Sequence, residues 1–133
     1  MSAFKNQRAV AIVVVGLAVG ACSRSGGNTV TMEPGRSFEP VMSTISAGET
    51  VSFVSESDDA HSVTAYEDGI PENASYFASG GFEGEGEARD DVAGGLLSPG
   101  ESFEVKFEIP GTYRNFCIPH EDSGMTGRIV VEE

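Results

Sequence analysis

From Asn28 onward, apolar and polar residues alternate with a period of two, and glycine or proline interrupts the alternation at short intervals. This period is the signature of β-strands, whose successive side chains point to opposite faces. In the most regular segment, 102–109, the inward-facing side chains are expected to be Phe103, Val105, Phe107 and Ile109. Further strands are expected over 29–32, 38–45, 51–53, 61–66, 113–117 and 129–131, with Pro40 at a bulge or edge. About seven short strands predict an all-β fold, an antiparallel Greek-key β-sandwich or barrel.

The alternation lapses between Asp68 and Gly100, where glycine and acidic residues are frequent. This stretch is interpreted as a long loop with one helical turn near 85–92. It contains no pairing of a nucleophile with a base. We therefore expect a surface excursion rather than a catalytic lid.

The start of the chain resembles an export signal. Lys5 and Arg8 precede an unbroken run of small and apolar residues over 9–21. The run is shorter than the roughly twenty residues that a membrane-spanning helix needs, and its place behind two positive charges is typical of a secretory signal. A buried core helix is the alternative, which the glycines of the run disfavour. Residues 1–21 are therefore expected to be a signal peptide.

The run ends in Val19-Gly20-Ala21-Cys22, which resembles the lipobox of prokaryotic lipoproteins. The resemblance implies that Cys22 is lipidated, with plain cleavage or an uncut anchor as alternatives. Residues 22–28 would then be a flexible, lipid-anchored tether, and 29–133 the folded domain. The expected location is extracytoplasmic, on the outer face of the cell membrane.

The composition is strongly acidic. The 133 residues include 8 Lys+Arg and 21 Asp+Glu, for a formal net charge of -13. Such a surface repels phosphate, which argues against nucleic-acid binding and against electrostatic adhesion to anionic lipid. The acidic surplus is either a docking patch for a basic partner or a generally solvated face suited to high salt. The length fits one domain, expected to be monomeric.

The candidate chemistry lies in segment 117–125. Cys117, His120 and Met125 place a thiolate, an imidazole and a thioether in one short loop after an expected strand. A second imidazole, His61, is expected on the inward face of an earlier strand. Soft sulfur ligands with two imidazoles match the preference of copper, and one Cys and two His with a weak axial Met form electron-transfer copper sites.

Each of these residues has an ordinary interpretation when it is taken alone. His61 could be a core histidine, Cys117 an inert buried thiol and Met125 core filler. A Cys22–Cys117 disulfide would leave both histidines unexplained, and a thioether is a poor zinc ligand. The residue types of the four candidate ligands, together with their order and spacing, favour a copper site over each of these alternatives.

The four residues resemble the type 1 copper signature of the plastocyanin-like cupredoxins, with its Cys-x-x-His-x-x-x-x-Met spacing. Segments 38–40, 47–53 and 60–63 are similar to the family's strands before its first histidine. Within the family, the acidic composition, the lipoprotein-like start and segment 76–82 look most like the halocyanins, membrane-attached blue copper proteins of haloarchaea. The resemblance runs from Val30 to the end of the chain and implies a cupredoxin-like sandwich.

The resemblance implies that His61, Cys117, His120 and Met125 bind one copper ion that cycles between Cu(I) and Cu(II). It also implies that the backbone amide of Ser62 donates to the Cys117 sulfur. The expected function is one-electron transfer rather than enzymatic catalysis, with redox proteins such as membrane respiratory complexes as donor and acceptor. A copper delivery or buffering protein and a metal-free structural lipoprotein are the alternatives.

Two features depart from this simple picture. Asn115 stands two residues before Cys117, where relatives tend to carry an aromatic residue, and an inward-facing amide there must find partners. Glu121 and Asp122 add negative charge inside the ligand loop, which favours the oxidised ion. We therefore expect Glu121→Gln to raise the reduction potential.

Overall fold

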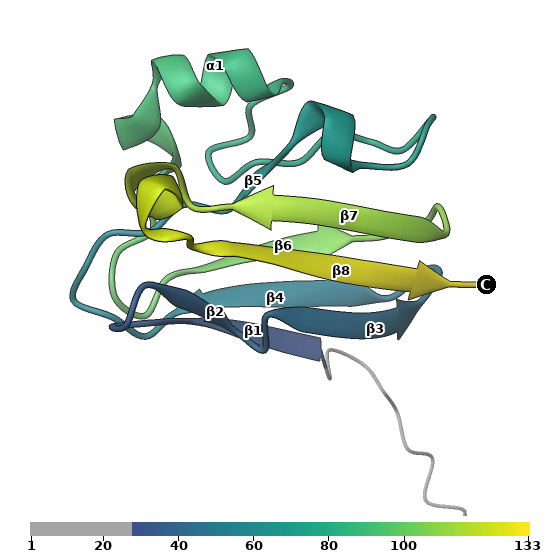
Figure 1. Cartoon of the computed structure of the whole chain (residues 1–133), viewed down its shortest axis with the longest axis horizontal. Helices are drawn as coiled ribbons and strands as arrows, with labels where there is room; N and C mark the ends of the chain where they lie inside the picture. Colours follow the sequence, from purple (N-terminus) through teal and green to yellow (C-terminus); the bar gives the residue numbers. More distant parts are fainter. Residues whose placement is uncertain (1–27) are drawn as a thin grey trace, which may run out of the picture.

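The computed structural model describes residues 28–133, which form two four-stranded sheets packed face to face (Figure 1). One sheet has the order β2-β1-β4-β6 and the other β3-β8-β7-β5. The strands are β1 Asn28–Glu33, β2 Ser37–Glu39, β3 Met42–Ser46, β4 Thr50–Ser55, β5 Thr64–Ala65, β6 Ser102–Lys106, β7 Gly111–Phe116 and β8 Thr126–Glu132. The predicted all-β sandwich is confirmed. The expectations for 1–27, including the signal peptide and Cys22, lie outside the described residues.

The sequence predicted an antiparallel arrangement, but two of the strand pairs are parallel. β1 runs parallel to β4, and β3 runs parallel to β8, while the other four pairs are antiparallel. The reason is the path of the chain, which leaves the first sheet after β2, forms β3 in the second sheet and returns as β4. Strands that are joined by such a crossing instead of a hairpin can align in the same direction.

The expected strand over 38–45 is in fact two strands in different sheets. β2 ends at Glu39, Pro40 and Val41 make the crossing, and β3 begins at Met42. Phe38 and Ile45 are both buried, so each side of the crossing contributes an apolar side chain to the core between the sheets. Pro40 therefore marks the connection between sheets rather than a bulge within one strand.

The prediction for segment 102–109 is correct at Phe107 and wrong at Ile109. Phe107 is 1% exposed, whereas Ile109 is 38% exposed. β6 ends at Lys106, so the strand alternation no longer governs the residues that follow. Phe103 and Val105 are half-buried because β6 is an edge strand of its sheet.

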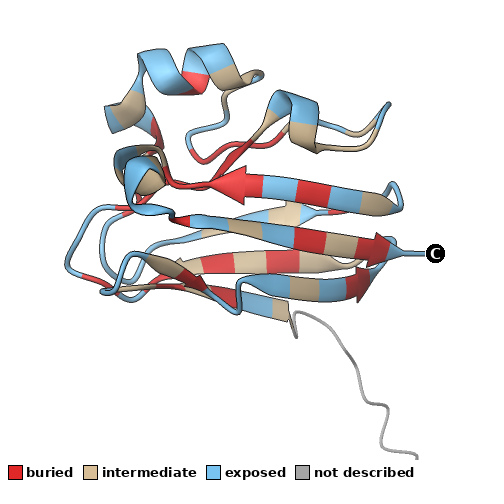
Figure 2. Cartoon of the chain, in the orientation of Figure 1, coloured by how far each residue is buried: buried red, intermediate tan, exposed pale blue. Residues whose placement is uncertain are grey.

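Residues 61–65 were expected to alternate between core and solvent, but all five are buried. Only Thr64 and Ala65 form strand β5, and isolated bridges join His61 to Leu97 and Thr64 to Ala78. The long 68–100 excursion folds back onto this segment, where the amide of Ala65 donates to the carbonyl of Phe77 and the amide of Ser79 donates to the carbonyl of Val63. Figure 2 colours the chain around β5 as buried. Because both faces of segment 61–65 are covered, neither face is exposed to solvent as the alternating pattern had predicted.

The expected helical turn near 85–92 is present as α1, Glu85–Asp90, followed by a 3₁₀ turn over Val92–Gly95. A further 3₁₀ turn, Glu67–Gly69, opens the excursion. In Figure 1, α1 lies on the β5–β7 side of the sandwich, beside the yellow turn that carries residues 118–123. None of the helices in residues 28–133 is long and apolar enough to cross a membrane.

Candidate metal centre

Strand β7 and the turn after it bring the C-terminal donors together. β7 ends at Phe116, Cys117 is 0% exposed, and a kinked 3₁₀ segment follows over Ile118–Ser123. Gly124 closes the segment with φ 84°, a left-handed conformation in which glycine carries no steric penalty. The chain therefore reverses within a few residues of Cys117.

Backbone hydrogen bonds fix the shape of this ligand loop. The amide of His120 donates to the carbonyl of Cys117 at 3.2 Å, and the amide of Met125 donates to the carbonyl of His120 at 3.2 Å. The amide of Cys117 in turn donates to the carbonyl of Met125 at 3.0 Å. Met125 is buried at the end of the loop, and its main chain is hydrogen-bonded to the main chains of Cys117 and His120.

His61 reaches the same place from the segment just before β5, the strand that pairs with β7. Its amide and carbonyl pair with Leu97 of the excursion, and its side chain is 0% exposed. The His61 ring lies at a steep angle to the His120 ring, with centroids 5.0 Å apart. Burial of a polar ring without a matching partner is costly, and no hydrogen-bond partner for His61 Nε2 is present among the described residues.

The distances between the donor atoms fit a shared metal ion. Cys117 Sγ lies 3.4 Å from His120 Nδ1 and 3.8 Å from His61 Nδ1, and all three atoms lie within 4.8 Å of one another. Imidazole nitrogen and thiolate sulfur bind first-row metals at about 2.0 and 2.3 Å, so a sulfur and a nitrogen that share one ion are at most about 4.3 Å apart. Both sulfur–nitrogen distances meet this limit. The buried set of two imidazoles and one thiol, with a thioether on the same loop, suits copper.

Ser62 connects His61 to the ligand loop. Its backbone amide donates to Cys117 Sγ at 3.4 Å, as the resemblance implied, and its hydroxyl accepts a hydrogen bond from the amide of Ile118 at 2.8 Å. These two hydrogen bonds link Ser62, the residue after His61, to both Cys117 and Ile118. The separation of the donors is therefore set by the protein before any metal binds.

Burial controls the protonation of two donors. It raises the pKa of the Cys117 thiol, an effect that the hydrogen bonds from Ser62 and His120 oppose. Burial also lowers the pKa of His61, and repulsion from His120 lowers it further. The site therefore presents a protonated thiol and a neutral His61 imidazole near neutral pH, and a metal must displace the thiol proton.

We predict that copper(I) binding at pH 8 releases about one proton per ion, the thiol proton of Cys117. In the pH range below the raised Cys117 pKa, copper affinity should then increase about tenfold per pH unit, because each ion displaces one proton. A pH-stat titration measures the release, with Cys22→Ser as the matched control that keeps it. Copper binding without proton release would contradict the buried-thiol account.

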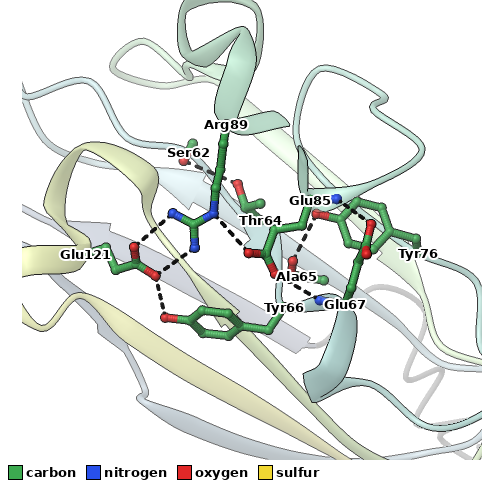
Figure 3. Close-up of polar contacts among 9 residues, drawn as sticks. All are labelled: Ser62, Thr64, Ala65, Tyr66, Glu67, Tyr76, Glu85, Arg89 and Glu121. Carbon is green, nitrogen blue, oxygen red and sulfur yellow. Dashed lines mark hydrogen bonds and ion pairs between the residues drawn. The ribbon is translucent and has the colours of Figure 1, made fainter. Parts of the chain in front are cut away.

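A polar cluster braces the ligand loop from outside, as Figure 3 shows. Arg89 of α1 binds both carboxylate oxygens of Glu121 at 2.9 and 3.0 Å, and Tyr66 Oη donates to the same carboxylate at 2.8 Å. Arg89 also pairs with Glu85 at 2.9 Å and lies 4.4 Å from the ring centre of Phe116. The excursion is thus clamped to the loop between His120 and Met125.

The ion pair between Arg89 and Glu121, which we call the clamp, changes the expected electrostatic effect of Glu121 on the metal site. The two Arg89 hydrogen bonds are the main reason that the pKa of Glu121 is lowered, so its negative charge stays in place and is balanced by a guanidinium. From the sequence alone this charge was expected to be unbalanced. The pairing with Arg89 could not be predicted, because no local pattern relates a residue on α1 to one in the ligand loop.

We predict opposite shifts of the reduction potential when either member of this pair is neutralised. Glu121→Gln should raise the potential because Arg89 is then unbalanced, and Arg89→Gln should lower it. A unit charge about 10 Å from the ion contributes roughly 0.4–1.7 kcal/mol at effective dielectrics of 80 to 20, or about 20–70 mV for one electron. Voltammetry of the copper-loaded variants measures both shifts.

The matched control for this pair is Glu104→Gln, an exposed change of equal charge on β6 in the other sheet. It should shift the potential by less than either clamp variant, since exposed distant charges are screened. Shifts of the same sign in both clamp variants would contradict the electrostatic assignment.

Asn115 faces inward, as expected, but does not find the partners that were expected. It is 1% exposed, and neither its amide oxygen nor its amide nitrogen has a hydrogen-bond partner among residues 28–133. Its strand neighbours are Ala65 and Gly127, two small residues that leave room for an amide but offer no side-chain donor or acceptor. The β7 face beside the ligands is therefore less apolar than a row of aromatic residues would make it.

Comparison with known proteins places this geometry in context. Residues 27–132 match the model of the copper binding proteins of the plastocyanin/azurin family. A plastocyanin of Scenedesmus fuscus is 39% identical over 95 residues, which cover 71% of this chain and 86% of the relative. The chloroplastic plastocyanin of Chlamydomonas reinhardtii is 37% identical over 95 residues, and this chain spans 58% of its length.

Solved structures share the same arrangement. Oxidised plastocyanin from Dryopteris crassirhizoma superposes with a TM-score of 0.55 at 29% identity, covering 78% of this chain and 99% of that one. Amicyanin from Paracoccus versutus superposes with a TM-score of 0.56 at 28% identity, covering 79% and 80% of the two chains.

Proposed function

The chain belongs to the plastocyanin/azurin family of copper-binding proteins, so its cofactor is copper, and we propose that it is a one-electron carrier tethered outside the cytoplasm. In this proposal His61, Cys117, His120 and Met125 hold a single copper ion. The observation that carries the assignment is the convergence of two imidazole nitrogens and one thiol sulfur within 4.8 Å. The bound ion supplies a redox centre that alternates between Cu(I) and Cu(II).

The protein's part is to hold the donors still. The His61 main chain is paired with Leu97, the ligand loop is closed by its own backbone bonds, and Ser62 joins the two. Such a frame resists rearrangement when the charge of the ion changes, which keeps the barrier to electron transfer low. The frame supports a carrier rather than a catalyst, because its polar groups hold the donors instead of facing a substrate.

His120 is proposed as the exit for the electron. Cys117, His61 and Met125 are each at most 1% exposed, whereas His120 is half-buried. Of the four, it therefore offers the shortest path from the site to the surface at this end of the sandwich. The proposed partners are a redox donor and a redox acceptor, including membrane respiratory complexes.

The membrane tether is proposed from the start of the sequence. Residues 1–21 would be the signal peptide, lipidated Cys22 the anchor, 22–28 the tether and 29–133 the copper domain. The acidic composition and segment 76–82 support a halocyanin-like carrier of a halophile. Mass spectrometry of the protein from a prokaryotic host that makes lipoproteins tests the anchor. A diacylglycerol-modified Cys22 supports it, and an unmodified Cys22 contradicts it.

The rival function is copper delivery or buffering, which requires the metal to leave readily. Repeated oxidation and reduction in the presence of excess copper(I) chelator separates the two functions. A carrier keeps its copper through the cycles and gives reversible one-electron voltammetry. Transfer of the metal to the chelator within the first cycles would favour delivery instead.

A further inference from the structure

The face formed by β7 and β8 carries two arginines in an otherwise acidic protein. Arg114 on β7 and Arg128 on β8 lie directly opposite each other in the antiparallel register, and both are exposed. Within residues 28–133, neither guanidinium forms an ion pair or a side-chain hydrogen bond. Like charges directly opposite each other destabilise a β-ladder. Both guanidinium groups are therefore available to pair with carboxylates of a partner.

The surroundings of the two arginines form a docking surface. A depression of about 210 Å³ is lined by Val41, Tyr66, Arg114, Thr126, Gly127 and Arg128. Val41 and its neighbour Met42 are 53% and 48% exposed, two of the three large hydrophobic side chains that are exposed in the described part of the chain. We name this surface, consisting of Val41, Met42, Tyr66, Arg114 and Arg128, the arginine face.

The arginine face is connected to the copper site through stacked rings. Arg114 Cζ lies 5.0 Å from the ring centre of Tyr66, and the Tyr66 ring stacks on Phe116 at 4.2 Å between centroids. Phe116 is bonded to Cys117 through one peptide link. Burial raises the pKa of Tyr66 to about 12, with a contribution from its hydrogen bond to Glu121, so the ring stays neutral at ordinary pH.

We propose that the arginine face is the docking site for an acidic redox protein, whose carboxylates pair with Arg114 and Arg128 above a short path to the copper. This inference rests on the proposed electron-carrier function. One electron moves between the redox centre of the partner and the copper ion, one being oxidised as the other is reduced, without proton transfer or bond formation. Arginine suits such a site because its planar fork binds carboxylates at two points.

An acidic protein fits this face better than an anionic membrane. Two arginines are a small charge against a formal net charge of -13, which as a whole repels an extended sheet of lipid phosphates. A protein partner needs only a local cluster of carboxylates and can bury the exposed Val41 and Met42 beside it, as protein interfaces do.

The first test locates the binding of anions on the copper(I)-loaded full chain at low ionic strength. Paramagnetic hexacyanochromate(III) should broaden the NMR signals of residues 114 and 126–128, and the double variant Arg114→Gln/Arg128→Gln should lose this broadening. Lys106→Gln, which removes one positive charge on β6, is the control on another strand and should keep it. Broadening elsewhere, or the same loss in the control, overturns the proposal.

The second test distinguishes the possible occupants. A deca-glutamate peptide represents the acidic protein surface, and phosphatidylglycerol vesicles represent a lipid surface. Peptide binding should weaken by about three- to tenfold in the double glutamine variant, given the usual strength of exposed ion pairs, and should return in Arg114→Lys/Arg128→Lys. Vesicle binding that depends on the two arginines, or no peptide binding, overturns the acidic-protein assignment.

The third test separates docking from the carrier function. Oxidation of the reduced protein by hexacyanoferrate(III) should slow by about three- to tenfold in the double glutamine variant, and reduction by neutral hydroquinone should be unchanged. A rate with hexacyanoferrate(III) equal to that of the unmodified protein overturns the docking proposal alone. Loss of redox cycling with both reagents in the unmodified protein would count against the carrier function itself.

Discussion

Replacement of Cys117 by serine is expected to abolish the intense visible absorption of the copper-loaded protein and to weaken copper binding by more than about a hundredfold. The Cys117 thiolate is the only anionic soft donor of the set, and a serine hydroxyl is neither soft nor ionised at neutral pH. Cys117 also accepts the hydrogen bond from the Ser62 amide that ties the His61 segment to the ligand loop. Copper titration followed by absorption and by equilibrium dialysis measures both effects.

Cys22→Ser is the matched control, because it makes the same chemical change at the only other cysteine of the chain. The control should keep both the colour and the affinity. The Cys117 variant should stay folded, since serine fills slightly less space and the ligand loop keeps its backbone hydrogen bonds. A Cys117→Ser protein that retains the absorption would remove Cys117 from the site.

Phe107→Ala is expected to lower the free energy of unfolding by about 3–5 kcal/mol, the usual cost of emptying a buried aromatic position. Phe107 packs edge-to-face against Tyr113 and Phe77, with ring centroids 4.8 and 5.5 Å apart. It therefore joins β7 to the excursion that covers His61. Denaturant unfolding of the copper-free protein measures the loss without a contribution from metal binding.

Ile109→Ala supplies the control, two residues along the same segment. Ile109 is 38% exposed, so its truncation should cost less than about 1 kcal/mol. A strict alternation through 102–109 would instead bury both side chains and make the two costs comparable. Comparable losses in the two variants would contradict the observed end of β6 at Lys106.

The site was predictable from the sequence because three of its donors lie in one short segment. Cys117, His120 and Met125 are close in sequence, and the backbone bonds that shape their loop are local. His61 was expected on the inward face of a strand over 61–66, but the strand that forms there, β5, includes only Thr64 and Ala65. The structure holds His61 through a single bridge to Leu97, a contact with a distant segment that no period-two pattern specifies.

Contacts between distant segments account for most of what the sequence did not reveal. The pairing of Arg89 with Glu121 joins a surface helix to the ligand loop, and the parallel pairing of β1 with β4 follows from a crossing between sheets. Each depends on where the folded chain returns, and a single sequence carries no local signal for it. The burial of Ser62 and Thr64 was missed for the same reason, because the excursion covers them.

The most direct measurement of the central claim is a copper titration of the purified full chain, followed by visible absorption and by the NMR signals of the two imidazoles. The account predicts saturation at one ion per chain, an intense blue colour, and a change in the imidazole signals of both His61 and His120 on binding. A protein that stays colourless with excess copper, and whose imidazole signals do not change, would contradict the account.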